Sequence, residues 1–174
     1  KMKAIVTGGA GFIGSNLVDE LTKQGHVVTV IDDLSTGNTE NLNKSADFKL
    51  CDISKDVNLL REIFVGGDVV FHLAALARVQ PSIDNPIEFN NVNVNGTLNV
   101  LVAAQEAGIK RVVYSASSSA YGDTEQFPTP ETAPTNPMSP YGLQKLIGEQ
   151  YCKLFSDVYG LDTCSLRYFN VYGE

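Results

Sequence analysis

Residues 3–14 read K-A-I-V-T-G-G-A-G-F-I-G, an apolar run that passes through a cluster of glycines into a helical pattern. The run Lys3–Thr7 is typical of a buried strand, and glycines allow the tight turn that joins such a strand to a helix. Backbone N–H groups and the positive end of the following helix bind a pyrophosphate at this point. The stretch therefore predicts a dinucleotide-binding fold with a phosphate turn that contains Gly8, Gly9, Gly11 and Gly14.

Apolar strands and amphipathic helices alternate along the rest of the chain. Strands are expected at Lys3–Thr7, Val27–Ile31, Asp47–Leu50, Val69–His72, Arg111–Ser115 and Thr163–Tyr168. Helices are expected at Phe12–Gln24, Val57–Phe64, Glu88–Ala107 and Pro140–Tyr159. This order predicts an α/β fold with a doubly wound parallel sheet, the Rossmann arrangement. The proline-rich segment Asp123–Ser139 is expected to form a loop over the ligand crevice.

The composition narrows the possible partners. A net charge of −7 argues against a nucleic-acid surface, which needs clustered Lys and Arg. No apolar run approaches the length of a bilayer span, so no membrane segment is expected. The cysteines Cys51, Cys152 and Cys164 form no C-x-x-C pair, and with only two histidines the chain offers no metal site. We expect these cysteines to be buried or partly buried free thiols in a reducing cytoplasm.

Two acidic residues indicate which dinucleotide binds. Asp32 follows the second predicted strand, eighteen residues after Gly14. A carboxylate there can accept hydrogen bonds from both hydroxyls of an adenosine ribose, and it would repel a 2′-phosphate. Asp33 is acidic as well, where an NADP enzyme can offer arginine. The sequence therefore favours NAD over NADP.

Tyr141 and Lys145 are four residues apart at the start of a predicted helix, so both side chains lie on one face. A tyrosine with a pKa near 10 is a poor base at neutral pH. A neighbouring ammonium and the positive charge of oxidised nicotinamide would lower that pKa. Tyr141 can then take or return an alcohol proton while hydride moves to or from the cofactor. The spacing alone would equally describe a half-buried tyrosine beside a solvated lysine.

Ser117 strengthens the case for chemistry. It follows the fifth predicted strand in Y-S-A-S-S-S-A-Y-G, residues 114–122, at the carboxyl edge where open α/β sheets bind ligands. A hydroxyl there can hydrogen-bond both a substrate oxygen and the tyrosine. We predict Ser117, Tyr141 and Lys145 as the catalytic set, whereas for Ser118 and Ser119 a serine-rich loop is as good an explanation as substrate binding.

Six motifs occur in order along almost the whole chain: T-G-G-A-G-F-I-G, H-L-A-A, N-V-N-G-T, S-S-S-A-Y-G, S-P-Y-G-L-Q-K and L-R-Y-F-N-V-Y-G. In this combination the chain resembles the extended short-chain dehydrogenase/reductase family, especially its UDP-sugar 4-epimerases. The resemblance implies NAD as cofactor and an isomerase that inverts C4 of a UDP-hexose or UDP-N-acetylhexosamine through a transient 4-keto sugar. The ordered set is highly specific for the family and less specific for the substrate.

The resemblance also implies a role for each matching residue. The pyrophosphate would be lined by Gly8, Gly11, Phe12, Ile13 and Gly14, and the adenosine ribose held by Asp32, Asp33 and Asn38. Asp52 and Ile53 would flank the adenine, and Tyr141, Lys145 and Tyr168 would lie near the nicotinamide. Leu73, Ala74 and Ala75 would pass beneath the cofactor, supported by Asn93, although the first three would equally be core residues. The substrate would contact Ser117, Ser118, Ser119 and Asn170.

The chain departs from patterns in the family in two ways. Ala77 stands where some epimerases carry a lysine, so that cofactor contact is missing. Ser118 and Ser119 stand where related sugar dehydratases place Asp-Glu, so the elimination of water has no obvious catalyst and epimerisation is favoured. The alternatives are another nucleotide-sugar enzyme (a dehydratase, decarboxylase or reductase) and a non-catalytic dinucleotide-binding sensor.

The resemblance further implies a homodimer in which the helices Glu88–Ala107 and Pro140–Tyr159 form a four-helix contact. We expect residues 2–174 to be one NAD-binding Rossmann domain. We also expect the smaller C-terminal substrate domain to be largely absent, because the chain stops just after its sixth predicted strand. The expected protein is cytoplasmic and binds a UDP-sugar, without a nucleic-acid, membrane or metal partner.

Overall fold

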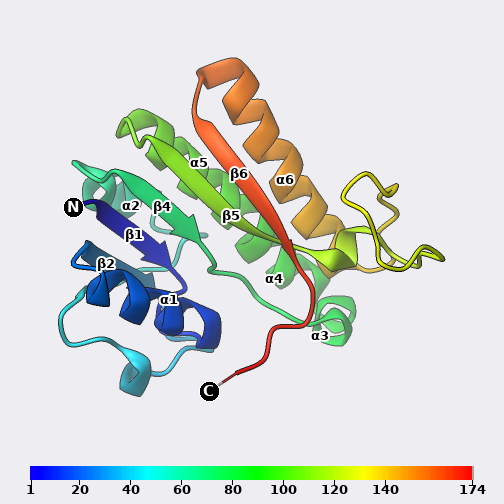
Figure 1. The fold of residues 1–174 in the computed structure, drawn as a ribbon, viewed down its shortest axis with the longest axis horizontal. Helices are drawn as coiled ribbons and strands as arrows, with labels where there is room; N and C mark the ends of the chain where they lie inside the picture. The colour runs from blue at the N-terminus through cyan, green and yellow to red at the C-terminus, as the bar shows by residue number, and fades with distance from the viewer. Residues whose placement is uncertain (174) are drawn as a thin grey trace.

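A six-stranded parallel sheet forms the centre of the molecule, with helices on both faces, in a computed structural model that describes residues 1–173 (Figure 1). The strands are β1 (Lys3–Thr7), β2 (Val27–Asp32), β3 (Asp47–Leu50), β4 (Val69–His72), β5 (Arg111–Ser117) and β6 (Asp162–Tyr168). They lie in the order β3-β2-β1-β4-β5-β6, and every neighbouring pair is parallel. This is the Rossmann order, in which the sheet grows outward in both directions from β1 and β4. The predicted fold class is confirmed.

The helical segments cover the sheet unequally. They are α1 (Phe12–Lys23), η1 (Thr39–Asn41), α2 (Val57–Phe64), α3 (Val79–Asp84), α4 (Pro86–Asn90), η2 (Asn91–Gly96), α5 (Thr97–Glu106), η3 (Ser118–Ala120) and α6 (Pro140–Tyr159). α1 packs on β1 and β2 from one face, whereas α2, α5 and α6 lie side by side on the other (Figure 1).

Each face has its own apolar core. Under α1, Val6, Val18 and Val30 are almost completely buried. On the opposite face, a larger cluster around Phe64 and Leu101 joins α2, α5 and the sheet. The strands between these two layers read as nearly continuous apolar runs because both of their faces are covered, as is usual in parallel sheets.

Most predicted bounds agree with the structure within two residues, and the differences concern irregular helices. The stretch expected as one helix over Glu88–Ala107 begins at Pro86 and includes a π-helical segment, η2, between α4 and α5. η1, α3 and η3 were not predicted, because segments of three to six residues are too short to show a helical period. β5 extends two residues further than predicted and ends on Ser117. Within residues 1–173, no helix is both long and apolar enough to cross a membrane.

Candidate active site

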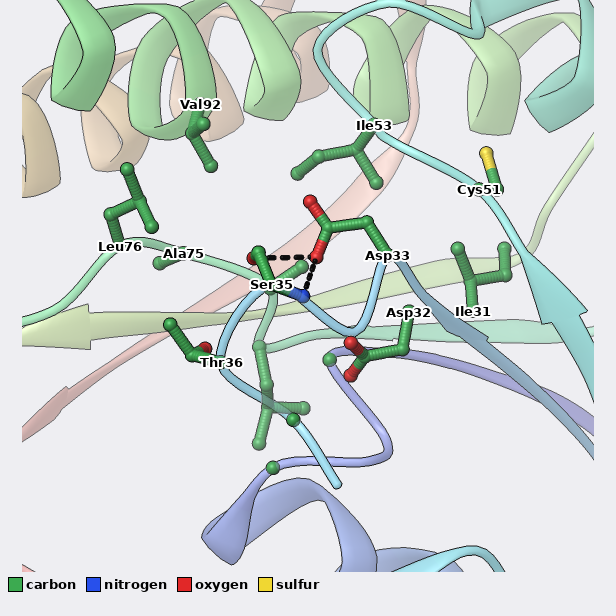
Figure 2. Close-up of a pocket in the computed structure, with 15 residues that line it drawn as sticks. Ile31, Asp32, Asp33, Ser35, Thr36, Cys51, Ile53, Ala75, Leu76 and Val92 are labelled. Carbon is green, nitrogen blue, oxygen red and sulfur yellow. Dashed lines mark hydrogen bonds between the residues drawn. The ribbon is translucent and has the colours of Figure 1, made fainter. Parts of the chain in front are cut away.

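Two adjoining cavities lie at the carboxyl edge of the sheet, where the strand order reverses between β1 and β4. The smaller cavity, of about 100 Å³, extends toward β2 and β3 and is shown in Figure 2. The larger cavity, of about 510 Å³, extends toward β5, β6 and the start of α6. Both cavities are lined by Gly8, Gly11, Leu73 and Ala75. The two cavities therefore meet at the glycine turn and form one continuous trough.

The glycine turn between β1 and α1 forms the middle of this trough. Gly8 has φ +75°, and a Cβ built on it would lie 2.7 Å from the Ala74 nitrogen. A Cβ on Gly14 would lie 2.1 Å from the Gly8 carbonyl oxygen. No side chain caps the N-terminus of α1, and its first residues Phe12 and Ile13 line the larger cavity. A helix start with free backbone N–H groups facing a cavity is suited to an anionic ligand.

The two aspartates after β2 have different surroundings. Asp32 is 8% exposed, and its carboxylate accepts hydrogen bonds from the backbone N–H groups of Ala10 (3.0 Å) and Leu34 (2.9 Å). Asp33 is exposed and accepts hydrogen bonds from the Ser35 N–H (2.9 Å) and hydroxyl (2.6 Å). Figure 2 shows the Asp33 carboxylate among the residues that line the smaller cavity. Asp32 therefore anchors the glycine turn, whereas Asp33 leaves its charge exposed in the wall of the cavity.

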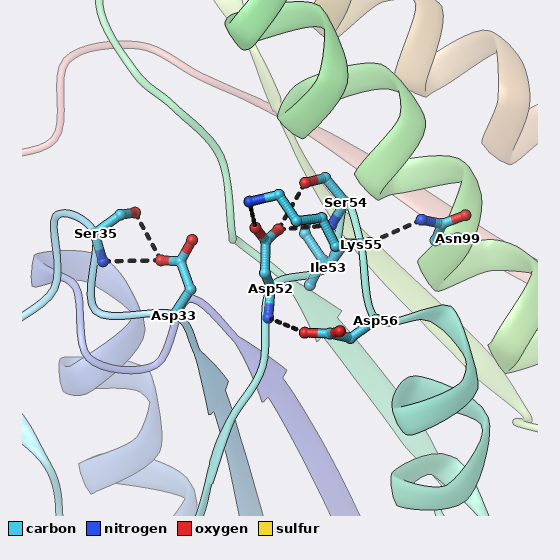
Figure 3. A network of polar contacts seen from close by, with 8 residues as sticks. All are labelled: Asp33, Ser35, Asp52, Ile53, Ser54, Lys55, Asp56 and Asn99. Atoms are coloured by element: carbon cyan, nitrogen blue, oxygen red, sulfur yellow. Dashed lines mark hydrogen bonds and ion pairs between the residues drawn. The ribbon is translucent and has the colours of Figure 1, made fainter.

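Asn38 and Asp52, which the resemblance placed around the adenosine, line neither cavity. The side chain of Asn38 caps η1 by accepting a hydrogen bond from the Glu40 N–H (3.0 Å). The carboxylate of Asp52 accepts from the Ser54 N–H (2.9 Å) and pairs with Lys55 at 2.7 Å, as Figure 3 shows. The structure instead brings a segment that was not predicted, Ser35 to Gly37, and the predicted Ile53 to the wall of the smaller cavity.

The segment after β4 forms the wall between the two cavities. Leu73, Ala74 and Ala75 line the trough as expected. Asn93, on the π-helical η2, is 1% exposed and touches neither cavity. Its amide holds Leu76 on both sides, accepting from the Leu76 N–H (2.8 Å) and donating to the Leu76 carbonyl (2.9 Å). Asn93 therefore fixes the shape of this segment from behind.

Ser117, Tyr141 and Lys145 come together in the larger cavity. α6 begins immediately before Tyr141 because the Ser139 hydroxyl caps the Gly142 N–H at 3.0 Å and Pro140 occupies the first turn. Lys145, one turn on, is 4% exposed, and its Nζ donates to the Ser115 carbonyl at 2.8 Å. That nitrogen lies 6.0 Å from the centre of the Tyr141 ring.

The protonation of this set is governed by burial. Burial lowers the pKa of Lys145 to about 8, so its ammonium persists at neutral pH but is easily discharged. Burial raises the pKa of Tyr141, and a hydrogen bond with the Ser117 side chain opposes this rise. The expected lowering of the Tyr141 pKa is therefore wrong for the protein by itself, because the cost of burying a phenolate is the larger effect.

A buried histidine lies near Lys145. His72, at the end of β4, is 1% exposed, and its ring nitrogens lie 2.6 Å from the Thr7 Oγ1 and 2.9 Å from the Thr97 Oγ1. Burial, followed by repulsion from Lys145, lowers the pKa of His72 to about 3. The imidazole is therefore neutral at physiological pH and adds no second charge beneath Lys145.

The remaining wall of the larger cavity contains both predicted and unpredicted residues. Ser118, Ser119, Tyr168 and Asn170 line it as expected. Additional lining residues are Ala77, Arg78, Val79, Phe169 and Val171. All but Val79, the first residue of the short helix α3, lie outside helices and strands, where the sequence has no period that predicts them. The expected loop Asp123–Ser139 contains no helix or strand, but none of its residues lines the trough. It projects to the side of α6 (Figure 1), with the Asn136 N–H bonded to the Ala120 carbonyl at its base.

The three cysteines are free, but only two of them are buried. Burial raises the pKa of Cys51 to about 11 and of Cys152 to about 12, so both thiols stay protonated. Cys51 lines the smaller cavity as a small apolar group. Cys164 is exposed on β6, and the expectation that all three would be at least partly buried is wrong for this residue.

A doubly wound sheet with a glycine turn at its reversal point and acidic residues after its second strand is typical of a nicotinamide-dinucleotide domain. The family model described as NAD dependent epimerase/dehydratase matches residues 4–174. The chain belongs to this family.

Individual proteins that are similar to this chain are named as epimerases. A UDP-glucose 4-epimerase of Mycolicibacterium smegmatis is 42% identical and is aligned over 99% of this chain and 57% of its own length. A UDP-glucose 4-epimerase of Thermotoga maritima, solved with UDP-glucose, is 43% identical with a TM-score of 0.96, covering 99% of this chain and 57% of that one. A UDP-N-acetylglucosamine 4-epimerase of Methanobrevibacter ruminantium, in complex with UDP-N-acetylmuramic acid, is 42% identical with a TM-score of 0.94, covering 99% and 56%. The chain thus spans about half the length of the relatives it matches.

Proposed function

We propose that the protein is an NAD-dependent nucleotide-sugar 4-epimerase acting on a UDP-hexose or a UDP-N-acetylhexosamine. The observation that carries this proposal is the meeting of Ser117, Tyr141 and Lys145 in one cavity that adjoins the glycine turn. The names of the similar proteins support the substrate class, since they include epimerases of both kinds of sugar nucleotide. Residues 2–174 are, in this proposal, the cofactor-binding part.

In the proposed reaction, Tyr141 removes the proton of the C4 hydroxyl while the C4 hydride leaves the sugar, which becomes a 4-keto sugar. Bound NAD supplies the hydride acceptor. After the keto sugar turns in the pocket, hydride returns to its opposite face and Tyr141 gives the proton back to the oxygen. Ser117 hydrogen-bonds Tyr141, and the Lys145 ammonium, joined by the positive charge of oxidised nicotinamide, favours the phenolate.

The cofactor contacts follow from the two cavities. In this proposal Asp32, helped by Asp33, binds the adenosine ribose and Ile53 flanks the adenine, which is supported by the position of all three in the wall of the smaller cavity. The glycine turn and the start of α1 are placed for the pyrophosphate. Tyr168 and Asn170 belong to the nicotinamide and substrate side. Asn38, Asp52 and Asn93 remain predicted cofactor residues, and their hydrogen bonds to neighbouring backbone groups hold the loops around the two cavities.

Tyr141→Phe in the full-length protein tests the proposal. The mixture of UDP-glucose and UDP-galactose, or of their N-acetyl forms, is separated by chromatography after incubation with each variant. The substitution removes only the acid/base hydroxyl, so turnover should fall by roughly 10²–10⁴-fold while NAD remains bound. Normal turnover in Tyr141→Phe would overturn the proposal. Accumulation of a 4-keto product, or steady release of NADH, would point to a dehydratase, decarboxylase or reductase instead.

We also propose a cytoplasmic homodimer. Three unpaired thiols support a reducing compartment. On α6, Leu143, Leu154 and Val158 are between 49% and 62% exposed and recur at the spacing of one helix face. Such an uncovered apolar face beside α5 fits a contact between two copies. Light scattering after size-exclusion chromatography should give twice the monomer mass, and Leu154→Glu should halve it.

A further inference from the structure

Arg78 is a positively charged residue in the wall of the larger cavity that no acidic group neutralises within residues 1–173. The charged residues that line this cavity are Lys145 and Arg78, with no carboxylate among them. Lys145 is buried and bonded to the Ser115 carbonyl. Arg78 is exposed, and within residues 1–173 its guanidinium forms no hydrogen bond or ion pair. Of the two cations, Arg78 is therefore the one that is free to bind a ligand.

The backbone at Arg78 is held in a conformation that arginine does not favour. Its φ is 85° and its ψ is 143°, and only one other non-glycine residue in the described part of the chain, Leu34, has a positive φ. Such strain persists only where the surroundings enforce it, and it is often found at ligand sites.

The surroundings of Arg78 explain how this conformation is enforced. On one side, Asn93 holds both backbone groups of Leu76. On the other side, the Ser82 hydroxyl donates to the Val79 carbonyl at 2.6 Å and accepts the Tyr141 N–H at 3.1 Å. Arg78 thus stands between two fixed points, one of which also positions Tyr141. Its place relative to the proposed catalytic tyrosine is set before a ligand arrives.

We propose that Arg78 binds a diphosphate in the larger cavity. The inference rests on the proposed function, because both the cofactor and a UDP-sugar carry this group. A guanidinium presents parallel N–H donors that match phosphate oxygens, and it stays charged at all relevant pH values. A chain with a net charge of −7 offers anions no general attraction, so an anion depends on local groups, to which Arg78 adds a full positive charge. The diphosphate belongs either to the nucleotide sugar or to the dinucleotide.

The test is the binding of UDP and of NAD, each by calorimetry, to the full-length protein and to Arg78→Ala. A lost charge-assisted hydrogen bond should raise the Kd of the affected ligand roughly tenfold or more. An increase for UDP alone assigns Arg78 to the substrate diphosphate, and an increase for NAD alone assigns it to the cofactor. If both Kd values stay within twofold, the inference is wrong. Lys44→Ala, which removes another cation with no partner in residues 1–173 and outside both cavities, is the control for net charge.

Arg78→Gly and Arg78→Lys separate the charge from the backbone strain. Glycine adopts a positive φ without cost, so the melting temperature should rise by roughly 2–4 °C while UDP or NAD binding weakens as in Arg78→Ala. Lysine keeps the charge but lacks the paired N–H donors of the guanidinium. The Kd of Arg78→Lys for the affected ligand should therefore lie between those of the wild type and Arg78→Ala. Unchanged binding in Arg78→Gly would overturn the inference. These measurements report binding and not turnover. The Arg78 inference can therefore fail while Tyr141→Phe still lowers turnover as proposed, and the proposed function can fail while Arg78 still binds a diphosphate.

Discussion

The two ends of the trough are opposite in charge but alike in construction. The smaller cavity has Asp32 and Asp33 in its wall, whereas the larger cavity has Lys145 and Arg78. At each end, one charged group is buried and bonded to the backbone: Asp32 accepts two N–H groups, and Lys145 donates to a carbonyl. The other group, Asp33 or Arg78, is exposed.

This comparison indicates that buried and exposed charges have different roles, and that the two ends of the trough differ in the ligand groups they can bind. In the proposed function, the buried charges fix loops and tune a reacting group, and the exposed charges contact the ligand. Carboxylates suit ribose hydroxyls, and cations suit anions and developing negative charge, so we expect a dinucleotide to bind in the trough in one direction only. Between the ends, the glycine turn offers backbone N–H groups and no side-chain charge.

The largest effect is expected for Lys145→Met, which removes the buried charge at the cationic end and keeps most of the side-chain volume. In the full-length protein, kcat should fall by roughly 10²–10⁴-fold because Tyr141 loses its neighbouring ammonium. Stability should change in the opposite direction. Burial lowers the pKa of Lys145 to about 8, so the charged form is costly to bury at pH 7. Its removal should raise the free energy of unfolding by roughly 1–3 kcal/mol.

Lys153→Met is the matched control, since Lys153 lies on the same helix, is exposed and pairs with Asp157. It should leave both kcat and stability nearly unchanged. Urea unfolding and the epimerase assay measure the two quantities. An unchanged kcat in Lys145→Met would show that the buried cation has no part in the reaction.

Gly14→Ala tests the uncharged middle of the trough and should have the next largest effect. Its Cβ would lie 2.1 Å from the Gly8 carbonyl oxygen, so the turn must open. The free energy of unfolding should fall by roughly 1–3 kcal/mol through overpacking. NAD affinity should fall at least tenfold, by about 1.4 kcal/mol or more, because the N–H groups no longer converge. Ser15→Ala, in the same turn of helix, should change neither quantity, and a Gly14→Ala variant with full NAD affinity would contradict this account of the turn.

Asp32→Asn and Asp33→Asn form a matched pair at the acidic end. Asp32→Asn replaces an oxygen that accepts a backbone N–H, so stability should fall by roughly 1–3 kcal/mol and NAD affinity with it. Because Asp33 is exposed, Asp33→Asn should change the free energy of unfolding by less than about 0.5 kcal/mol. It should instead narrow the preference for NAD over NADP by several fold, since less negative charge faces the 2′-phosphate. Thermal unfolding and titration with both cofactors separate the two roles, and equal effects on stability would refute the division.

How far the sequence predicts this site depends on the type of signal. The glycine turn and the Ser117, Tyr141 and Lys145 set were predicted because strand and helix periods place them, and the structure brings them to one edge. The cofactor roles of Asn38 and Asp52 rest on the resemblance alone and stay predictions, because the hydrogen bonds that their side chains accept come from backbone N–H groups two residues further along the chain. The sequence does not predict Arg78 as a ligand residue, because its position depends on an irregular segment without helix or strand periodicity, which hydrogen bonds from Asn93 and Ser82 hold in place.

The smallest effect concerns the pH dependence of stability. The pKa of Lys145 is lowered from its ordinary 10.5 to about 8, so between these values the unfolded chain keeps a proton that the folded protein has released. The Lys145 contribution to the free energy of unfolding should therefore rise with pH in this window, by at most about 1.4 kcal/mol per unit. Cys51 and Cys152, whose pKa values are raised to about 11 and 12, act in the opposite sense above their ordinary value of 9.0.

The wild type alone cannot separate the contributions of Lys145 and the two cysteines to the pH dependence of stability. The difference between wild type and Lys145→Met can, because both share the cysteines: the stability advantage of Lys145→Met should shrink steadily from pH 8 to pH 10 in urea unfolding. A constant difference would mean that Lys145 titrates as a solvated lysine and that its burial has no electrostatic consequence.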